Sequence, residues 1–187
     1  MHDILEIFKK SGALLNGHFR LTSGLHSPIY FQCALVLQYP DYCRQIAEKT
    51  IGNFSTKKID LVISPAVGGI VIGQEVGRQL GVRTIFTERI NGVMSLRRGF
   101  WIEKGEKVLI CEDVVTTGGS VYEVIELVKE AQAEIAAVCY IVDRSGGQVQ
   151  FGFDQYALVQ MSAQTYTPES CPLCKEKIAI QKPGSRT

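Results

Sequence analysis

The first third of the chain alternates between helical and irregular hydrophobic patterns. Apolar residues recur at helical spacing in residues 1–12, and residues 40–54 form a second helical segment with a proline at its start. Between them, residues 12–33 are rich in glycine, serine and aromatic residues, which indicates short strands and turns. Pro28 excludes a central strand position there, because proline cannot donate to a sheet.

A regular pattern begins near residue 60. Short apolar, β-branched runs predict strands at residues 60–64, 82–88, 107–113 and 134–144. Helices are expected at residues 66–80 and 116–132, and a loop with a β-ribbon at residues 90–106. Strands that alternate with helices predict right-handed βαβ units, and therefore an α/β fold with a parallel sheet covered on both faces.

This topology also predicts where the chemistry lies. In open α/β sheets, ligands bind beyond the carboxyl ends of the parallel strands. The segments expected at that edge are Ser64–Gly69, Thr87–Arg89, Glu112–Ser120 and Asp143–Arg144.

Composition narrows the class of protein. The 187 residues suit one domain with a full core, and 45% hydrophobic with 21% charged residues is an ordinary globular balance. A net charge of +1 gives no reason to expect nucleic-acid binding, and no run approaches the ~20 apolar residues that cross a bilayer. The N-terminal segment lacks the basic start and apolar block of a signal peptide, so we expect a cytoplasmic protein.

Six cysteines are too few and too scattered to form a disulfide framework in a chain of this length. Four of them are expected to be small buried hydrophobes: Cys33, Cys43, Cys111 and Cys139. Cys171 and Cys174 form a single CPLC, which supplies two thiolates where a structural zinc site needs four ligands. A metal site shared across a dimer is one alternative, but a pair of surface thiols is favoured, and no metal ligand is assigned.

The strongest chemical signal is the segment VLICEDVVTTGGS at residues 108–120. An apolar strand ends in Glu112 and Asp113, and Val114 and Val115 lead to a loop just before a helix. That loop contains Thr116, Thr117, Gly118, Gly119 and Ser120. The N-terminus of a helix offers unpaired N–H groups to an anion, glycine permits close approach, and the hydroxyls add donors. The loop therefore suits a phosphate monoester.

The acid pair makes this interpretation more specific. Carboxylates would repel a polyphosphate, but they can accept hydrogen bonds from vicinal sugar hydroxyls while a phosphate sits further along. The ligand implied is a sugar 5-phosphate. The alternative is a solvated acidic turn followed by an ordinary helix start.

This segment resembles the motif with which type I phosphoribosyltransferases bind PRPP, a pyrophosphorylated ribose 5-phosphate. The resemblance implies that Glu112 and Asp113 hold the ribose hydroxyls and that the loop from Val114 to Ser120 binds the 5-phosphate. It implies a mainly parallel sheet flanked by helices, in a single domain over residues 1–187. Within it we expect an N-terminal hood at about 1–40, a PRPP-binding core at about 41–160 and a tail at about 161–187.

A second loop fits the first. Ala66, Val67, Gly68 and Gly69 follow a predicted strand and open a helix. In the resembling family this position binds pyrophosphate through exposed backbone amides. The alternative is an ordinary glycine-rich connection.

The base must be inferred from other residues. The segments Leu21–Gly24 and Ser27–Gln32 resemble the N-terminal part of orotate phosphoribosyltransferases. Tyr30 and Phe31 could stack on a flat base, and groups near Thr22 could bind its polar edge. One or both aromatic rings could instead belong to a small core.

The resemblance also assigns Thr116 and Arg144 to orotate. A bidentate guanidinium suits a base that carries a carboxylate. The alternative for Asp143-Arg144 is an exposed ion pair at the end of a strand.

Several family lysines are absent. Thr22 stands where a lysine is usual before Ser-Gly, the loop around Gly68 has none, and Thr87–Arg89 keeps a single basic residue. NGVMSLRRGF replaces the family's K-x-H loop. Because charge builds on departing pyrophosphate, a cation is still needed. The candidate catalytic residues are Arg89, Arg97, Arg98 and Asp113, although Arg97 and Arg98 could form a solvated ribbon edge.

The resemblance to a shorter bacterial branch of orotate phosphoribosyltransferases implies the reaction orotate + PRPP → orotidine 5′-phosphate + pyrophosphate. It places the chain in pyrimidine (UMP) biosynthesis, with Mg²⁺ as cofactor and a homodimer as the assembly. A phosphoribosyltransferase for a purine or another base and a non-catalytic PRPP-sensing regulator are the alternatives. Nucleic-acid and membrane partners are not expected.

Overall fold

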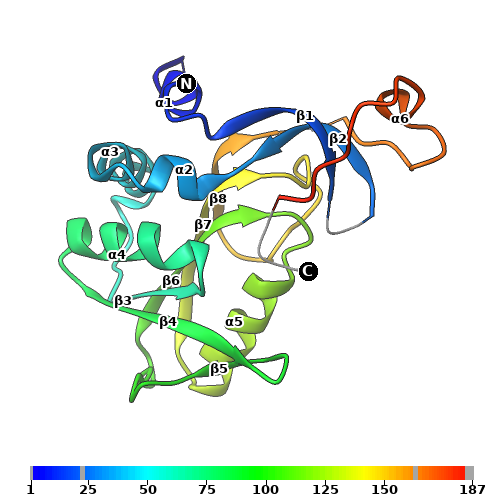
Figure 1. The fold of residues 1–187 in the computed structure, drawn as a ribbon. Helices are drawn as coiled ribbons and strands as arrows, with labels where there is room; N and C mark the ends of the chain where they lie inside the picture. Colours follow the sequence, from blue (N-terminus) through cyan, green and yellow to red (C-terminus); the bar gives the residue numbers. More distant parts are fainter. Residues whose placement is uncertain (1, 22–23, 162–163, 184–187) are drawn as a thin grey trace. The chain divides into compact units, whose positions relative to one another are not determined.

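The computed structural model describes residues 2–21, 24–161 and 164–183, which divide into two compact units (Figure 1). The first unit is built from the described residues up to Tyr39 and from those after Met161. The second unit runs from Pro40 to Met161. No helix among the described residues combines the length and apolar character that crossing a bilayer requires.

The second unit contains a six-stranded sheet in the order β5-β4-β3-β6-β7-β8. Its strands are β3 (Leu61–Pro65), β4 (Arg83–Ile90), β5 (Val93–Leu96), β6 (Lys107–Val115), β7 (Glu134–Asp143) and β8 (Gln155–Gln160). All neighbouring pairs are parallel except β4 and β5, which form an antiparallel hairpin at one edge. The predicted parallel sheet and β-ribbon are confirmed, whereas β8 has no counterpart among the predicted strands.

Helices cover both faces of this sheet. On one face lie α3 (Pro40–Ile51), which continues into the short 3₁₀ helix η1 (Gly52–Phe54), and α4 (Gly68–Leu80). On the other face lies α5 (Gly119–Glu130) (Figure 1). Because both faces are buried, the central strands contain almost uninterrupted apolar runs rather than alternating ones.

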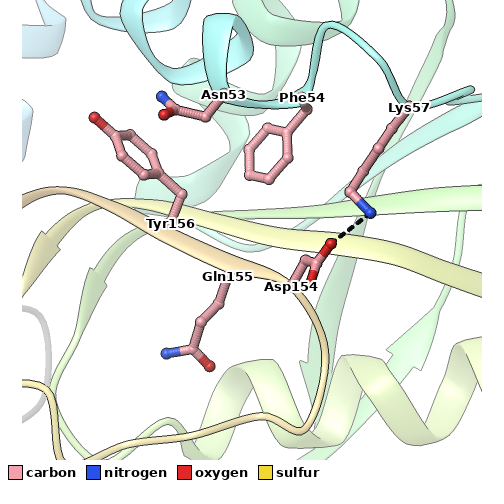
Figure 2. A pocket seen from close by; sticks show the side chains of 6 residues that line it. All are labelled: Asn53, Phe54, Lys57, Asp154, Gln155 and Tyr156. Atoms are coloured by element: carbon pink, nitrogen blue, oxygen red, sulfur yellow. Dashed lines mark ion pairs between the residues drawn. The ribbon is translucent and has the colours of Figure 1, made fainter.

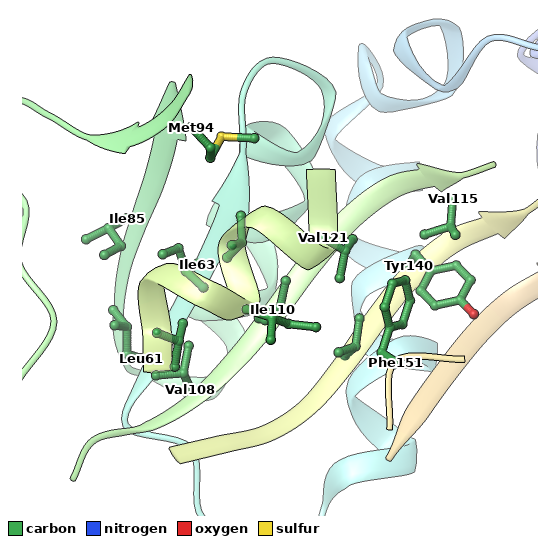
Figure 3. Close-up of a cluster of buried hydrophobic side chains, with 14 residues drawn as sticks. Leu61, Ile63, Ile85, Met94, Val108, Ile110, Val115, Val121, Tyr140 and Phe151 are labelled. Carbon is green, nitrogen blue, oxygen red and sulfur yellow. The ribbon is translucent and has the colours of Figure 1, made fainter. Parts of the chain in front are cut away.

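The apolar side of α5 forms one half of the core. Val121, Val124, Ile125 and Val128 of this helix pack against alternate residues of the central strands. The strand residues include Ile63, Val108 and Ile110, and Phe151 and Tyr140 close the cluster at one end (Figure 3). The sheet is therefore held firmly by packing close to the acid pair, which lies within β6 near its carboxyl end.

Helix α4 lies very close to the sheet. Gly73 and Gly77 are one turn apart, and a Cβ atom on them would overlap the side-chain oxygens of Ser64 and Thr84 respectively. A larger residue would have to displace these side chains or lift the helix, so the two glycines let the middle and later part of α4 pack closely on β3 and β4.

The hairpin between β4 and β5 turns at Asn91 and Gly92, whose φ angles of 50° and 86° are both left-handed. Two consecutive residues of positive φ form the tight turn that matches the twist of an antiparallel pair, and Asn-Gly is the sequence that favours it.

The first unit contains α1 (His2–Lys10), β1 (Leu14–Arg20), β2 (His26–Phe31), α2 (Cys33–Leu37) and α6 (Pro172–Lys175). Strands β1 and β2 form a two-stranded antiparallel sheet, so Pro28 occupies an edge strand as expected. The C-terminal segment returns to this sheet: Phe19 pairs with Gln181 and His26 with Tyr166. The beginning and end of the chain thus form one unit.

Candidate active site

The four segments predicted to carry the chemistry meet at one edge of the sheet in the second unit. In the parallel register Pro65 lies opposite Thr87, and Val115 lies opposite Asp143. The chain continues these pairings beyond the strands, since the Ala66 amide donates to the Thr87 carbonyl at 2.8 Å. The prediction that these segments share the carboxyl edge is confirmed.

The loop before α5 has the geometry of an anion cradle. Gly118 precedes the helix with a φ of 76°, and Val149 and Phe151 pack where its Cβ would lie, so the position needs glycine. The first helical hydrogen bond runs from the Tyr122 amide to the Gly118 carbonyl at 2.9 Å. The amides of residues 119–121 precede that bond and point out of the helix end, where the helix dipole favours an anion. Thr116 and Thr117 are exposed beside them.

The strand that is predicted to end at the acid pair continues to Val115, so Glu112 lies within the paired part of β6 rather than at its end. Glu112 is buried there, with only 8% of its surface exposed. One carboxylate oxygen, Oε1, accepts a 3.3 Å hydrogen bond from the Asp113 amide, and the other, Oε2, has no partner among the described residues. Burial, reinforced by the neighbouring Asp113, raises the pKa of Glu112 well above its usual range. A buried carboxylate oxygen without a partner is costly, so the site suits a ligand that donates a hydrogen bond there.

Asp113 lies where the two candidate loops meet. Its side-chain oxygen Oδ1 accepts a 2.8 Å hydrogen bond from the Val114 amide. A Cβ atom on Gly68 would overlap the Asp113 carboxylate, so this position requires glycine. The Ala66–Val67 peptide bond of the same loop is cis. The loop at residues 66–69 and the acid pair therefore form a single site.

Arg144 lies beside the end of β6, just before the loop at residues 116–120. Its amide donates to the Val115 carbonyl at 2.7 Å. Asp143 is buried, and its carboxylate accepts hydrogen bonds from the amides of Ser145 and Gly147 at 2.7 and 2.8 Å. The Asp143 carboxylate thus organises the loop that presents Arg144, rather than lying exposed at the strand end.

The three candidate arginines differ in their partners. Arg89 forms an ion pair with Glu123 of α5 at 2.7 Å, and Arg98 forms a bidentate pair with Glu88 at 2.8 and 2.9 Å. Arg97 is exposed, and no ion pair of it is present in the described part of the chain. A hydrogen bond from Arg98 lowers the pKa of Glu88, and the charge of the nearby Arg97 adds to that effect. Of the three candidates, Arg97 has its charge most available to a ligand.

The candidate base residues of the first unit also differ. Phe31 is buried at 3% exposure and packs edge-to-face on Phe8 with ring centroids 4.6 Å apart, so it is a core residue. Tyr30 is partly exposed, and the centroid of its ring lies 5.6 Å from that of Phe19. Exposure favours Tyr30 over Phe31 as a stacking surface. Thr22 lies outside the described residues.

Comparison with known proteins identifies the family. The model of the phosphoribosyl transferase domain matches residues 36–162. A curated orotate phosphoribosyltransferase from Chlorobium phaeobacteroides is 58% identical over 183 residues, which cover 98% of this chain and 95% of that protein. Proteins of the same name from Chlorobaculum parvum and Desulforamulus reducens are 57% and 53% identical over 99% and 98% of this chain, and over 96% of each relative. The chain belongs to the orotate phosphoribosyltransferase family.

Solved structures agree on the fold of this phosphoribosyltransferase. Orotate phosphoribosyltransferase from Aeropyrum pernix superposes with a TM-score of 0.72 at 21% identity, over 84% of this chain and 93% of that one. Adenine phosphoribosyltransferase from Rhodothermus marinus superposes with a TM-score of 0.69 at 18% identity, over 86% of this chain and 100% of that one. Enzymes named for different bases share this fold, so the fold alone does not choose the base.

The second unit of this phosphoribosyltransferase also contains a cavity, which lies away from the loop at residues 116–120. Figure 2 shows this space of about 270 Å³, lined by Asn53, Phe54, Lys57, Asp154, Gln155 and Tyr156. Its residues lie before β3 and at the start of β8, at the amino edge of the strands. Lys57 pairs with Asp154 across it at 2.6 Å. It is therefore separate from the candidate active site.

Some residues that shape the site of this phosphoribosyltransferase could not be found from sequence. Glu123 and Glu88 each pair with a candidate arginine, and they lie 34 and 10 residues from those partners. Glu123 lies outside the predicted segments. Glu88 lies within Thr87–Arg89 and Asp143 is the neighbour of Arg144, but neither was assigned a role of its own.

Burial of Glu112 predicts a pH-dependent stability. Its pKa is about 4.5 in the unfolded chain and higher in the folded one, so the folded state holds more protons between the two values. The contribution of protonated Glu112 to the free energy of unfolding is fully present below pH 4.5, and it is lost as pH rises through the folded pKa. We expect Glu112→Gln to be more stable than the wild type above pH 4.5, with a gap that widens as pH rises.

Urea unfolding of both proteins across this pH range measures the gap. Glu126→Gln is the matched control, because Glu126 is exposed and pairs only with Lys129 on the surface of α5. A Glu112→Gln protein that is less stable than the wild type at neutral pH would contradict the assigned cost of burial.

Proposed function

We propose that this protein transfers the ribose 5-phosphate of PRPP to orotate, giving orotidine 5′-phosphate and pyrophosphate in pyrimidine biosynthesis. The observation that carries the proposal is the acid pair of β6, set between an anion-binding helix start and a glycine-rich loop. The relatives that are more than half identical over nearly the whole chain support orotate as the base.

The site would bind PRPP at three places. The loop from Val114 to Ser120 would hold the 5-phosphate through amides and hydroxyls at the start of α5. Glu112 and Asp113 would accept hydrogen bonds from the ribose hydroxyls, which gives the unpartnered oxygen of Glu112 a donor. Ala66–Gly69 would face the pyrophosphate, with Gly68 leaving room beside Asp113.

These contacts would fix the ribose while its anomeric carbon reacts. The bond from that carbon to the pyrophosphate oxygen breaks, and its electron pair leaves with pyrophosphate. The base nitrogen then donates an electron pair to the oxocarbenium-like carbon. Because orotate is ionised at neutral pH, positioning and charge stabilisation contribute more than a strong base would.

A cation near the leaving group would stabilise the charge that develops there. Arg97 fits this role best, since the carboxylates of Glu123 and Glu88 already neutralise Arg89 and Arg98. Arg89 and Arg98 would act only if substrate displaced those partners.

The orotate contacts are proposed by resemblance. Thr116 and Arg144 adjoin the phosphate loop of the second unit, and a guanidinium can hold the orotate carboxylate through two hydrogen bonds. In the first unit, Tyr30 is the exposed aromatic candidate.

Mg²⁺ is the proposed cofactor. The donors around the acid pair are carboxylate, hydroxyl and carbonyl oxygens, the set that this hard cation prefers, with Asp113 the most accessible carboxylate. When bound, Mg²⁺ would neutralise charge on the pyrophosphate. Most of its ligands would come from substrate and water, as is usual for this ion.

The same proposal includes a homodimer in the cytoplasm. The dimer rests on the family resemblance. The cytoplasm agrees with six cysteines that are all free, as expected in a reducing compartment.

The direct test is turnover of orotate with PRPP and Mg²⁺, followed by the loss of orotate absorbance in the ultraviolet. We expect orotate to be consumed and uracil, adenine, guanine and xanthine to be left unchanged. Use of a purine in place of orotate would overturn the base assignment, and no turnover with any base would favour a PRPP-sensing regulator.

Asp113→Asn tests the ribose contact in the same assay. A hydrogen bond to a charged group contributes about 1.5–3 kcal/mol, so kcat/KM for PRPP should fall by roughly 10- to 100-fold. Asp154→Asn is the matched control at the opposite edge of the sheet, where the exposed pair with Lys57 should contribute little. Equal kinetics for the two variants would remove Asp113 from the site.

Arg97→Ala should lower kcat on the order of 10²-fold, since it removes a charge that acts where the leaving group becomes negative. Single-turnover kinetics at saturating PRPP would measure the chemical step. Arg44→Ala on the exposed face of α3 controls for loss of a surface arginine. If Arg97→Ala were fully active while Arg89→Ala were not, Arg89 would be the catalytic cation.

A further inference from the structure

Four side chains that can bind a metal converge in the first unit. The proposed reaction uses none of the four. They are His18 of β1, His26 of β2, and Cys171 and Cys174 at the start of α6. One ligand atom from each lies within 4.8 Å of all the others. The sequence suggested a metal at the CPLC only as a site shared across a dimer, and it did not point to the two histidines, which lie far from the cysteines in the chain.

The burial of the cluster corrects the expected pair of surface thiols. Cys171 has no exposed surface, and His18 and His26 are exposed by only 2% and 5%. Cys174 is the exposed member. The CPLC thus contributes one thiol to the interior of the unit and one at its surface.

The distances match those of a tetrahedral zinc site. Zinc bonds of about 2.0–2.1 Å to nitrogen and about 2.3 Å to sulfur place neighbouring ligand atoms roughly 3.3–3.8 Å apart. His18 Nε2 lies 3.6 Å from Cys171 Sγ and 3.7 Å from Cys174 Sγ. His26 Nδ1 lies 3.3 Å from Cys174 Sγ and 3.0 Å from His18 Nε2. Small shifts would bring all four onto one ion.

A hydrogen bond outside the cluster prepares His18 as a ligand. Its Nδ1 lies 2.8 Å from the Ile178 carbonyl, which can only accept, so Nδ1 carries the proton. The lone pair of a neutral His18 is then on Nε2, which faces the two sulfurs and His26. Orientation of a ligating imidazole by a backbone carbonyl is usual in metal sites.

We propose that His18, His26, Cys171 and Cys174 bind one structural Zn²⁺ ion. Two sulfurs and two imidazoles in tetrahedral arrangement favour zinc, and four protein ligands leave no position open for a substrate. The ion would join β1, β2 and the C-terminal segment. Short backbone pairings, such as Gln181 N to His18 O at 2.8 Å, and the hydrogen bond from His18 to Ile178 also connect these parts.

The proposal explains a difficulty of the first unit. An isolated two-stranded sheet is marginally stable, and small units of this kind often depend on a metal or disulfide in addition to their apolar core. Here the thiols are free and the C-terminal segment is held beside the sheet. A zinc ion would supply the missing crosslink.

The test uses the full-length protein purified without metal-chelating tags or chelators. Elemental analysis should find one zinc ion per chain, and Co²⁺ exchanged into the site should show the visible and thiolate charge-transfer bands of tetrahedral coordination. Chelation should lower the midpoint of thermal unfolding, and Zn²⁺, but not Mg²⁺, should restore it.

Cys174→Ser is the most informative variant, because its exposure makes a folding defect least expected. It should lose most of the zinc and the cobalt charge-transfer bands, whereas Cys33→Ala, which removes a buried thiol of the same unit outside the cluster, should keep one ion per chain. A wild-type protein that takes up no stoichiometric Zn²⁺ or Co²⁺, with Cys174 freely reactive to thiol reagents, would overturn the proposal. So would full zinc retention by Cys174→Ser.

Discussion

The candidate active site depends on the placement of two carboxylates near the carboxyl end of a buried strand. β6 lies in the middle of the sheet, and its apolar residues are enclosed by helices on both faces. The strand therefore delivers Glu112 into an environment that disfavours its charge, with one oxygen unpartnered. Such a cost is typical of a group that a ligand uses, which is the basis for proposing that the ribose hydroxyls bind there.

The rest of the second unit keeps the acid pair and both loops in place. Close packing of α4, which Gly73 and Gly77 permit, brings the 66–69 loop to Asp113. The left-handed Gly118 turns the chain from β6 into α5, next to the amides at the start of the helix and the exposed Thr116 and Thr117. Asp143 accepts hydrogen bonds from the loop that follows β7, and this loop holds Arg144 next to the end of β6. The catalytic geometry follows from packing against a rigid sheet.

Local patterns in the sequence predicted the parallel sheet, the hairpin and the edge where the chemistry lies, because periodicity and the glycine–hydroxyl loop are short-range signals. They did not predict β8, whose six residues follow a long loop without clear alternation. Long-range pairings were also hidden. Nothing near Arg98 in the chain shows that Glu88 neutralises it, and the burial of Phe31 depends on Phe8. The cluster of His18 and Cys171 exists only because the two ends of the chain fold together.

The most direct test of the central claim is a crystal structure of the protein with orotidine 5′-phosphate bound. The phosphate should accept hydrogen bonds from the amides and hydroxyls of residues 116–120, and the ribose hydroxyls should donate to Glu112 and Asp113. A phosphate bound at the 66–69 loop, or a ribose without contact to either carboxylate, would contradict the account.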